Sequence, residues 1–321
     1  MCPSPDKPMD RRELLRRISS FPIVSSGLAE ELLAGDYRSV FKGQGIEFDE
    51  ARHYQAGDDA RLIDWNVSAR FGEPYVKMFR EERELTVFLV LDISPSMHSV
   101  AAGPLNPYEQ ACLTLALLAF SAEEAGQRVG ALFFDRGLDR VYPPRKGRRH
   151  VMGILGGAIA VRAACRAEAR GSDLAMALAG AGRLLKRRSL VAVISDFYAA
   201  GWEGPLEDLA RKHDVVAVGI NNPLDREFPP MGLVPLEDPE TGLKIHASSG
   251  SPAFLSAWSR WHEDRGKWLE TVCRRSGAAC LPLSTGEDAG AVLKRFFGGR
   301  GERGTRGRRP GLRYGAGGGS R

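Results

Sequence analysis

The chain has 321 residues, of which 43% are hydrophobic, enough to bury one large core or a core with a small subdomain. Its formal net charge of +5 comes from the end of the chain: from Gly298 onward there are seven Arg and one Glu, which leaves 38 basic and 39 acidic residues before it. This balance argues against a folded part built to bind nucleic acid. The longest apolar runs, LTLALLAF and VMGILGGAIAV, are shorter than the roughly 20 residues of a membrane helix.

The first 84 residues are expected to hold surface helices followed by a small α/β module. Residues 10–34 alternate basic and apolar positions at helical spacing, which predicts one or two surface helices. Residues 46–54 and 75–79 alternate like strands. Asp58 or Asp59 is the expected cap of a short helix that ends near Ala69, and Trp65 in that helix is expected to anchor the module's core.

From residue 85 onward, short apolar runs alternate with longer helical patterns. Strands are expected at 85–91, 128–134, 190–195, 215–220 and 279–283, and helices at 108–126, 148–163, 173–188, 203–212, 252–276 and 287–297. This alternation predicts one α/β domain over residues 85–297, with a largely parallel sheet and helices on both faces. Two hairpins, near 138–142 and within 233–246, are expected at its edges.

The N-terminal residues and the cysteines favour a cytoplasmic protein, and the short apolar runs argue against membrane insertion. The N-terminal residues have no apolar core of the kind that a signal peptide requires. The five cysteines form no Cys-x-x-Cys motif, which favours a reducing compartment; they are Cys2, Cys112, Cys165, Cys273 and Cys280. Residues 298–321 are rich in Gly and Arg with few apolar side chains, so we expect them to be disordered.

The segment FLVLDISPSMHS, residues 88–99, places polar side chains where a buried strand ends. An unbroken apolar run is typical of a strand that is buried on both faces of a parallel sheet, and here it ends at Asp92. Asp196 ends another expected strand, and Ser172 and Asp173 open the helix between the two. Taken alone, Ser94 and Ser96 could cap the next helix, Ser172 could be an N-cap and Asp196 a turn residue. Ligands, however, bind at the carboxyl ends of parallel strands, where all three loops are predicted to lie.

If the strands that end at Asp92 and Asp196 are neighbours, their two carboxylates repel one another unless a cation lies between them. The candidate ligands are all oxygen atoms, which favours Mg²⁺, with Mn²⁺ and Ca²⁺ as alternatives, over Zn²⁺. They come from three loops and are Asp92, Ser94, Ser96, Ser172 and Asp196. Only two of these groups are charged, so such a site would be ready to accept a further carboxylate.

The three motifs DISPS, GSDLAMAL and ISDF resemble the metal-ion-dependent adhesion site of von Willebrand factor type A domains. The segments HYQAGDDARLIDWNVSAR, PYVKMFREERE and LDISPSM resemble the signature of the bacterial family called domain of unknown function 58. The resemblance implies a doubly wound sheet in the strand order 3-2-1-4-5-6. It also implies Mg²⁺ held by Asp92, Ser94 and Ser96 in the first loop, Ser172 in the second and Asp196 in the third.

Two residues depart from the pattern of the wider superfamily. Ser172 stands where threonine is usual, which keeps the hydroxyl but removes a methyl group that restricts the side chain. Phe197 stands where many adhesion domains have glycine, and we expect it to narrow the access to the cation. With Asp173, Phe197 is therefore counted among the residues that surround the predicted ligands.

Mixed charges crowd the segment before the sheet. The residues are Arg52, Asp58, Asp59, Arg61, Asp64, Arg70, Lys77, Arg80, Glu81, Glu82 and Arg83. One interpretation is a salt-bridge network that ties the small module to the sheet. The other is that exposed members, with Arg61, Asp64 and Arg70 as candidates, frame the metal face and select the partner.

Three function hypotheses follow. The first is a metal-dependent protein-interaction module, in which an Asp or Glu of a partner completes the coordination of the cation. The resemblance implies an adaptor or co-chaperone whose partners are a MoxR-type AAA ATPase and an acidic client loop. The second is a Mg²⁺-dependent phosphohydrolase with Asp92 as nucleophile, but the second residue after it is Ser94 rather than an acid. The third is weak, salt-sensitive nucleic-acid binding through the Arg- and Gly-rich tail. We favour the first, with no catalytic residues assigned.

Overall fold

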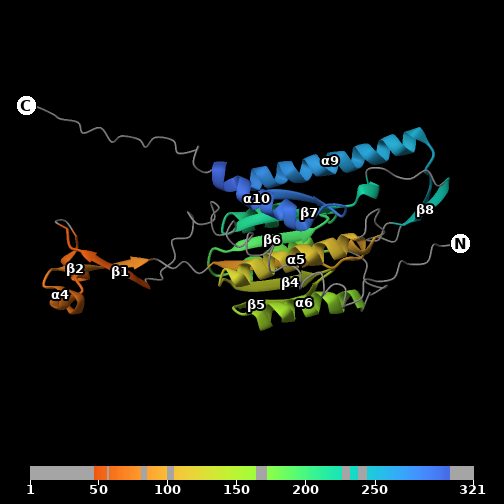
Figure 1. Ribbon diagram of the computed structural model, residues 1–321. Helices are drawn as coiled ribbons and strands as arrows, with labels where there is room; N and C mark the ends of the chain where they lie inside the picture. Colours follow the sequence, from red (N-terminus) through yellow and green to blue (C-terminus); the bar gives the residue numbers. More distant parts are fainter. Residues whose placement is uncertain are drawn as a thin grey trace, which may run out of the picture.

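The computed structural model describes residues 47–55, 58–80, 85–99, 105–163, 172–225, 232–237 and 244–303. The helices expected within residues 10–34 and the tail beyond residue 303 lie outside these ranges. The described residues form a small N-terminal module and a larger α/β domain, each of which can be followed in Figure 1.

The small module contains two antiparallel strands, β1 (Glu47–His53) and β2 (Tyr75–Arg80). Between them lie the short 3-10 helix η1 (Ala60–Leu62) and helix α4 (Trp65–Phe71). The cap of α4 is Asp64 rather than Asp58 or Asp59: its carboxylate accepts hydrogen bonds from the amides of Asn66 and Val67 at 3.0 and 3.2 Å. Asp58 instead pairs with Arg52 at 2.7 Å.

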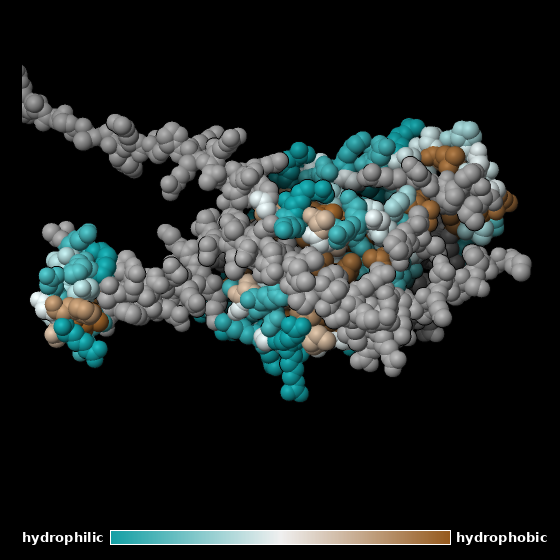
Figure 2. Space-filling view, viewed as in Figure 1, coloured by the Kyte–Doolittle hydropathy of each residue, from teal (hydrophilic) through white to brown (hydrophobic). Residues whose placement is uncertain are grey.

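The prediction that Trp65 anchors the module's core is wrong, because its side chain is 71% exposed. The buried residues of this module, among those described, are Asp64, Ser68 and Val76. A two-stranded sheet with one seven-residue helix offers too little interior for an indole. Figure 2 shows hydrophobic surface on this module, where Phe71 is 68% exposed.

The larger domain is built on one six-stranded sheet in the order β10-β7-β6-β3-β4-β5. Its strands are β3 (Thr86–Asp92), β4 (Arg128–Phe134), β5 (Leu138–Arg145), β6 (Leu190–Ser195), β7 (Asp214–Asn221) and β10 (Ala279–Ser284). All neighbours pair in parallel except β4 and β5. Counted along the chain, this order is 3-2-1-4-5-6, so the predicted von Willebrand factor A-like fold is confirmed.

Helices cover both faces of the sheet (Figure 1). One face packs against α5 (Pro107–Glu124), α6 (Arg148–Ala163) and α10 (Ala289–Arg303). The other packs against α7 (Leu174–Leu184), α8 (Glu203–Ala210) and α9 (Pro252–Ser276). Along β3, Leu89 and Leu91 enter the first core and Phe88 and Val90 the second, which explains why the strand is apolar without interruption.

The two predicted hairpins form in different ways. The first is part of the main sheet: β5 pairs with β4 at the sheet edge, and Pro143 and Pro144 lie where the register shifts between Val129 and Ala131. The second is a separate pair of antiparallel strands, β8 (Leu233–Glu237) and β9 (Lys244–Ser248), before α9. At the opposite edge of the sheet, β10 contains Pro282.

Helix α10 ends at Arg303 and so includes the first residues of the segment that we expected to be disordered. No helix in the described part of the chain has the length and apolar character needed to cross a membrane. Three cysteines are described as free thiols: Cys112 and Cys273 are buried, and Cys280 is half-buried.

The buried His213, between α8 and β7, is expected to make the folded protein less stable at acid pH. It is 3% exposed, neither ring nitrogen has a hydrogen-bond partner among the described residues, and burial lowers its pKa below the ordinary value. Below about pH 6.5 the unfolded state therefore binds a proton that the folded state resists, so the contribution of His213 to the free energy of unfolding falls.

Replacing His213 with Gln should reduce this acid-induced loss of stability, measured as the change in urea-unfolding free energy between about pH 7.5 and pH 5. The variant His246→Gln, at an exposed position in β9, is the matched control and should behave like the wild type. An unchanged pH dependence in His213→Gln would show that His213 is not responsible.

Candidate metal centre

Two predicted ligands meet at the carboxyl ends of neighbouring strands. Asp92 is the last residue of β3, and Asp196 directly follows β6. The two strands are parallel neighbours in register, with Leu91 opposite Ile194, so both carboxylates leave the sheet at the same edge. This is also where the strand order reverses, with β4 on one side of β3 and β6 on the other.

The first loop folds over Asp92. The amide of Ser94 donates to Oδ1 of Asp92 at 2.9 Å, and the hydroxyls of Ser94 and Ser96 lie 3.0 Å apart. Asp92, Ser94 and Ser96 are at most 7% exposed. Ser94 precedes the 3-10 helix η2 (Pro95–His98), but its side chain makes no capping hydrogen bond. The capping alternative therefore does not explain why a serine stands at this position.

The third loop is tied to the first by a residue that the sequence did not single out. The Ser195 hydroxyl donates to Oδ2 of Asp92 at 2.6 Å and accepts a hydrogen bond from the Phe197 amide at 2.9 Å. The Tyr198 amide donates to Oδ1 of Asp196 at 3.0 Å. Ser195 thus joins the two loops, although the only sequence signal for it is a hydroxyl beside Asp196.

The second loop reaches the same edge through the neighbouring strand. The Asp173 amide donates to the carbonyl of Asp135, just after β4, at 2.7 Å. The Asp173 carboxylate caps α7 by accepting a hydrogen bond from the Met176 amide at 2.8 Å. Its role is therefore to hold the loop that carries Ser172. The Ser172 hydroxyl is buried without a hydrogen-bond partner among the described residues.

Burial makes the two carboxylates resist ionisation. Burial first, and then the charge of Asp196, raises the pKa of Asp92 to about 7, while hydrogen bonds from Ser195 and Ser94 act in the opposite direction. Burial also raises the pKa of Asp196, against the lowering effect of the Ser96 hydroxyl, the Tyr198 amide and the Arg265 charge. A divalent cation would remove the conflict between the two carboxylates.

The donor set fits a hard cation. Within the described residues, no three His, Cys, Asp or Glu side chains come together as a metal cluster, so a cation here depends on serine hydroxyls and water as well as two carboxylates. Such ligands suit Mg²⁺, and each carboxylate oxygen of Asp92 has a lone pair beyond the hydrogen bond that it accepts. The Ser172 hydroxyl is buried without a partner among the described residues, and coordination to a cation would give it one.

Phe197 has an unusual backbone conformation. Its φ is 56°, in the left-handed region that glycine adopts without steric cost, and it stands where many adhesion domains have glycine. A non-glycine residue there costs about 1–3 kcal/mol, so the surrounding structure must hold it. The ring is 1% exposed and packs edge-on against Trp202, with 5.1 Å between the ring centroids. Packing of the Phe197 ring therefore helps to hold the left-handed backbone of the loop, and the expectation that Phe197 narrows the access to the cation stays a prediction.

The charged segment is described only in part. Arg52 pairs with Asp58, but both residues lie in the small module, so the network predicted between the module and the sheet stays a prediction. Asp64 caps α4, and Arg61 and Arg70 are exposed. The expectation that these three residues frame the metal face remains a prediction. The side chains of the other basic and acidic residues at 77–83 lie outside the described part of the structure.

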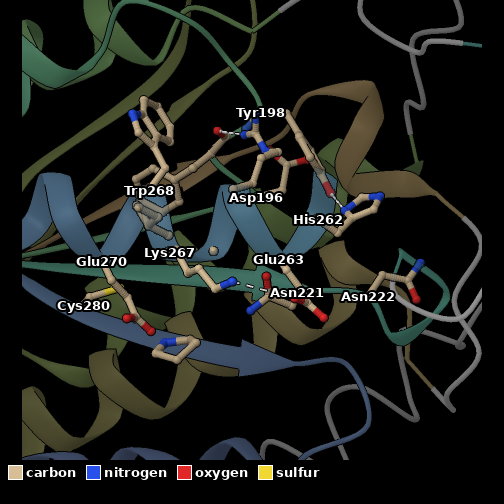
Figure 3. Close-up of a pocket in the computed structure, with 15 residues that line it drawn as sticks. Asp196, Tyr198, Asn221, Asn222, His262, Glu263, Lys267, Trp268, Glu270 and Cys280 are labelled. Atoms are coloured by element: carbon tan, nitrogen blue, oxygen red, sulfur yellow. Dashed lines mark hydrogen bonds and ion pairs between the residues drawn. The ribbon is translucent and has the colours of Figure 1, made fainter. Parts of the chain in front are cut away.

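A cleft of about 300 Å³ lies beside the candidate metal centre, between the third loop, the ends of β7 and β10, and α9. Figure 3 shows Asp196 and Tyr198 at one side of it and Lys267 directed toward Glu263. The Tyr198 hydroxyl lies 3.2 Å from Nδ1 of His262. Asp196 therefore belongs both to the candidate metal centre and to the lining of this cleft.

Comparison with known proteins places these loops in a family. The sequence profile described as protein of unknown function DUF58 matches residues 50–266. An uncharacterized protein of Mycobacterium tuberculosis is 32% identical over 293 residues, which cover 91% of this chain and 91% of that protein. The family match includes all five predicted cation ligands.

Two solved structures align with parts of this chain at lower similarity. An aerotolerance-related membrane protein from Bacteroides fragilis aligns with a TM-score of 0.46 and 14% identity, over 68% of this chain and 99% of that chain. A von Willebrand factor type A structure from Catenulispora acidiphila aligns with a TM-score of 0.38 and 12% identity, over 71% and 43%.

The pKa of Asp92 predicts how stability depends on pH and Mg²⁺. An unperturbed Asp titrates near pH 3.9, so between about pH 4 and pH 7 the metal-free folded state keeps a proton that the unfolded state has lost. The contribution of Asp92 to the free energy of unfolding in EDTA should therefore fall as the pH rises through this range, which is opposite in sign to the contribution of His213. Mg²⁺ should raise the melting temperature more at about pH 8 than at pH 5.

Thermal unfolding with Mg²⁺ and with EDTA at both pH values measures this difference. In Asp92→Asn the rise in melting temperature that Mg²⁺ produces should be lost at both pH values. A wild-type gain of equal size at the two pH values would contradict the role of Asp92.

Replacing Ser172 with Ala should separate stability from cation binding. In EDTA the melting temperature should stay the same or rise slightly, because the variant removes a buried hydroxyl that lacks a partner. The affinity for Mg²⁺, measured by calorimetry, should fall by about tenfold or more. Ser256→Ala, on an exposed part of α9, is the control and should leave the affinity unchanged. Wild-type affinity in Ser172→Ala would remove Ser172 from the ligand set.

Proposed function

The chain belongs to the family described as protein of unknown function DUF58, and on that premise we propose that it is a metal-dependent protein-interaction module. The residues that would hold the cation are Asp92, Ser94, Ser96, Ser172 and Asp196. When bound, Mg²⁺ would supply an electrophilic coordination position that a carboxylate of the partner completes.

The observation that carries this proposal is the combination of two buried carboxylates with a buried hydroxyl that has no protein partner. Three loops bring these groups to one edge of the sheet. Asp92 and Asp196 would provide the charge, and the serine hydroxyls would orient the coordination shell. Ser195 and Asp173 would hold the first and second loops in place through their own hydrogen bonds.

We propose that the partner is a MoxR-type AAA ATPase and that the client presents an acidic loop. This identification is supported by the resemblance of residues 43–97 to the family signature. The sequence contains no Gly-x-x-x-x-Gly-Lys-Ser/Thr loop, so the ATPase would hydrolyse the nucleotide while this chain acts as adaptor or co-chaperone in protein remodelling or maturation. A cytoplasmic site of action agrees with the cysteine usage of the chain.

The environment of Asp92 does not favour the phosphohydrolase alternative. The side chain is 1% exposed, and both carboxylate oxygens accept hydrogen bonds, from the Ser94 amide and the Ser195 hydroxyl. A nucleophile must reach its substrate, and the second residue after Asp92 is a serine that cannot act as a general acid at neutral pH.

A pull-down from an extract of the native organism tests the proposal. Wild-type protein in Mg²⁺ should retain an AAA ATPase that is lost in EDTA and lost with Asp92→Ala, because both changes remove the position that the partner's carboxylate completes. Asp208→Ala, at an exposed position in α8, is the control and should retain the ATPase. Mass spectrometry identifies the retained proteins. Identical sets under all conditions would rule out the metal bridge.

A further inference from the structure

Arg265 of α9 is a half-buried cation that reaches the third loop. Its guanidinium donates a hydrogen bond to the carbonyl of Phe197. The Cζ atom lies 4.2 Å from the centroid of the Tyr198 ring and 5.3 Å from that of Trp261. The guanidinium therefore combines a hydrogen bond to the loop backbone with contacts to two aromatic rings, a combination that suits a planar, charged group.

The loop that Arg265 contacts needs to be held. Asp196 would be a cation ligand, and the next residue, Phe197, has the left-handed φ of 56°. Two hydrogen bonds within the loop help to hold it. The Phe197 amide donates to the Ser195 hydroxyl, and the Tyr198 amide donates to the Asp196 carboxylate. Both bonds use the amide groups of the loop. Arg265 supplies the contact to a carbonyl, and it does so from a helix that lies outside the loop.

The aromatic neighbours fix the position of Arg265 itself. Tyr198 and Trp261 are parallel, with 5.8 Å between their ring centroids and 1° between their planes. Trp268, one turn of helix further on, lies with its ring centroid 5.9 Å from the guanidinium. Trp261, Arg265 and Trp268 all belong to α9, so a shift of this helix would move the guanidinium and the Phe197 carbonyl together.

We propose that Arg265 is a positioning residue through which α9 sets the geometry of Asp196, and hence the affinity of the metal centre. The link to cation affinity rests on the proposed function. The mechanical link between α9 and the third loop does not, because it follows from the contacts to Phe197 and Tyr198. The cleft between α9 and the sheet is lined by the same residues, so a partner that fills it would act on this link.

The positive charge of Arg265 and the contacts that it makes have opposite expected effects on the affinity for the cation. A guanidinium close enough to Asp196 for their charges to interact repels a second cation, so removing the charge would by itself strengthen cation binding. Arg265→Lys keeps the positive charge but loses the planar fork and the stacking on Tyr198. This variant therefore reports on geometry with little change in charge.

The affinity for Mg²⁺, measured by calorimetry, should be about tenfold weaker in Arg265→Lys than in the wild type. The matched control is Arg260→Lys, at an exposed position on the same helix, which should bind Mg²⁺ like the wild type. If Arg265 contributed only to general stability, Arg265→Lys would have a lower melting temperature, but the folded variant would bind Mg²⁺ with wild-type affinity.

Hydrogen exchange in EDTA tests the link without the cation. The amides of Phe197 and Tyr198 are both hydrogen-bonded, so their exchange reports opening of the third loop. In Arg265→Lys they should exchange at least about tenfold faster, while Arg260→Lys should match the wild type. Unchanged exchange, or unchanged Mg²⁺ affinity, in Arg265→Lys would overturn the inference. A wild-type protein that binds no Mg²⁺ would instead overturn the proposed function, and the exchange rates would still decide the link between α9 and the loop.

Discussion

The arrangement of the whole candidate site depends on the pairing of β3 with β6, because this pairing places two carboxylates at one edge of the sheet. Asp92 and Asp196 end up buried together, and burial favours the protonated form of each. The surrounding loops provide amides and hydroxyls that only partly offset this cost. The Ser94 amide and the Ser195 hydroxyl donate hydrogen bonds to Asp92, while the Ser172 hydroxyl is buried without a partner among the described residues.

The sequence allowed the sheet and the five candidate ligands to be predicted for a simple physical reason. Strands buried on both faces are apolar throughout, so β3 and β6 are recognisable, and the polar residue that ends each of them is found at once. The strand order came from the resemblance to von Willebrand factor type A domains, and the structure confirms it. The positions of helices α5 to α9 agree with the predictions to within a few residues.

What the sequence could not predict depends on contacts between distant residues or on the size of the local interior. Arg265 contacts Phe197 across 68 positions of the chain, and no local pattern distinguishes it from the other arginines of α9. Ser195 looks like an ordinary strand residue until its hydroxyl is found on Asp92. Trp65 is exposed because the small module has little core, which hydrophobicity along the chain does not reveal.

The prolines at the two edges of the main sheet limit how the protein can associate. Proline has no amide hydrogen, so β5, with Pro143 and Pro144, and β10, with Pro282, cannot offer a complete row of donors to an incoming strand. Extension of the sheet by a strand from another chain is thereby disfavoured at both edges. Edge-to-edge pairing between the sheets of two copies is correspondingly disfavoured, even at high protein concentration.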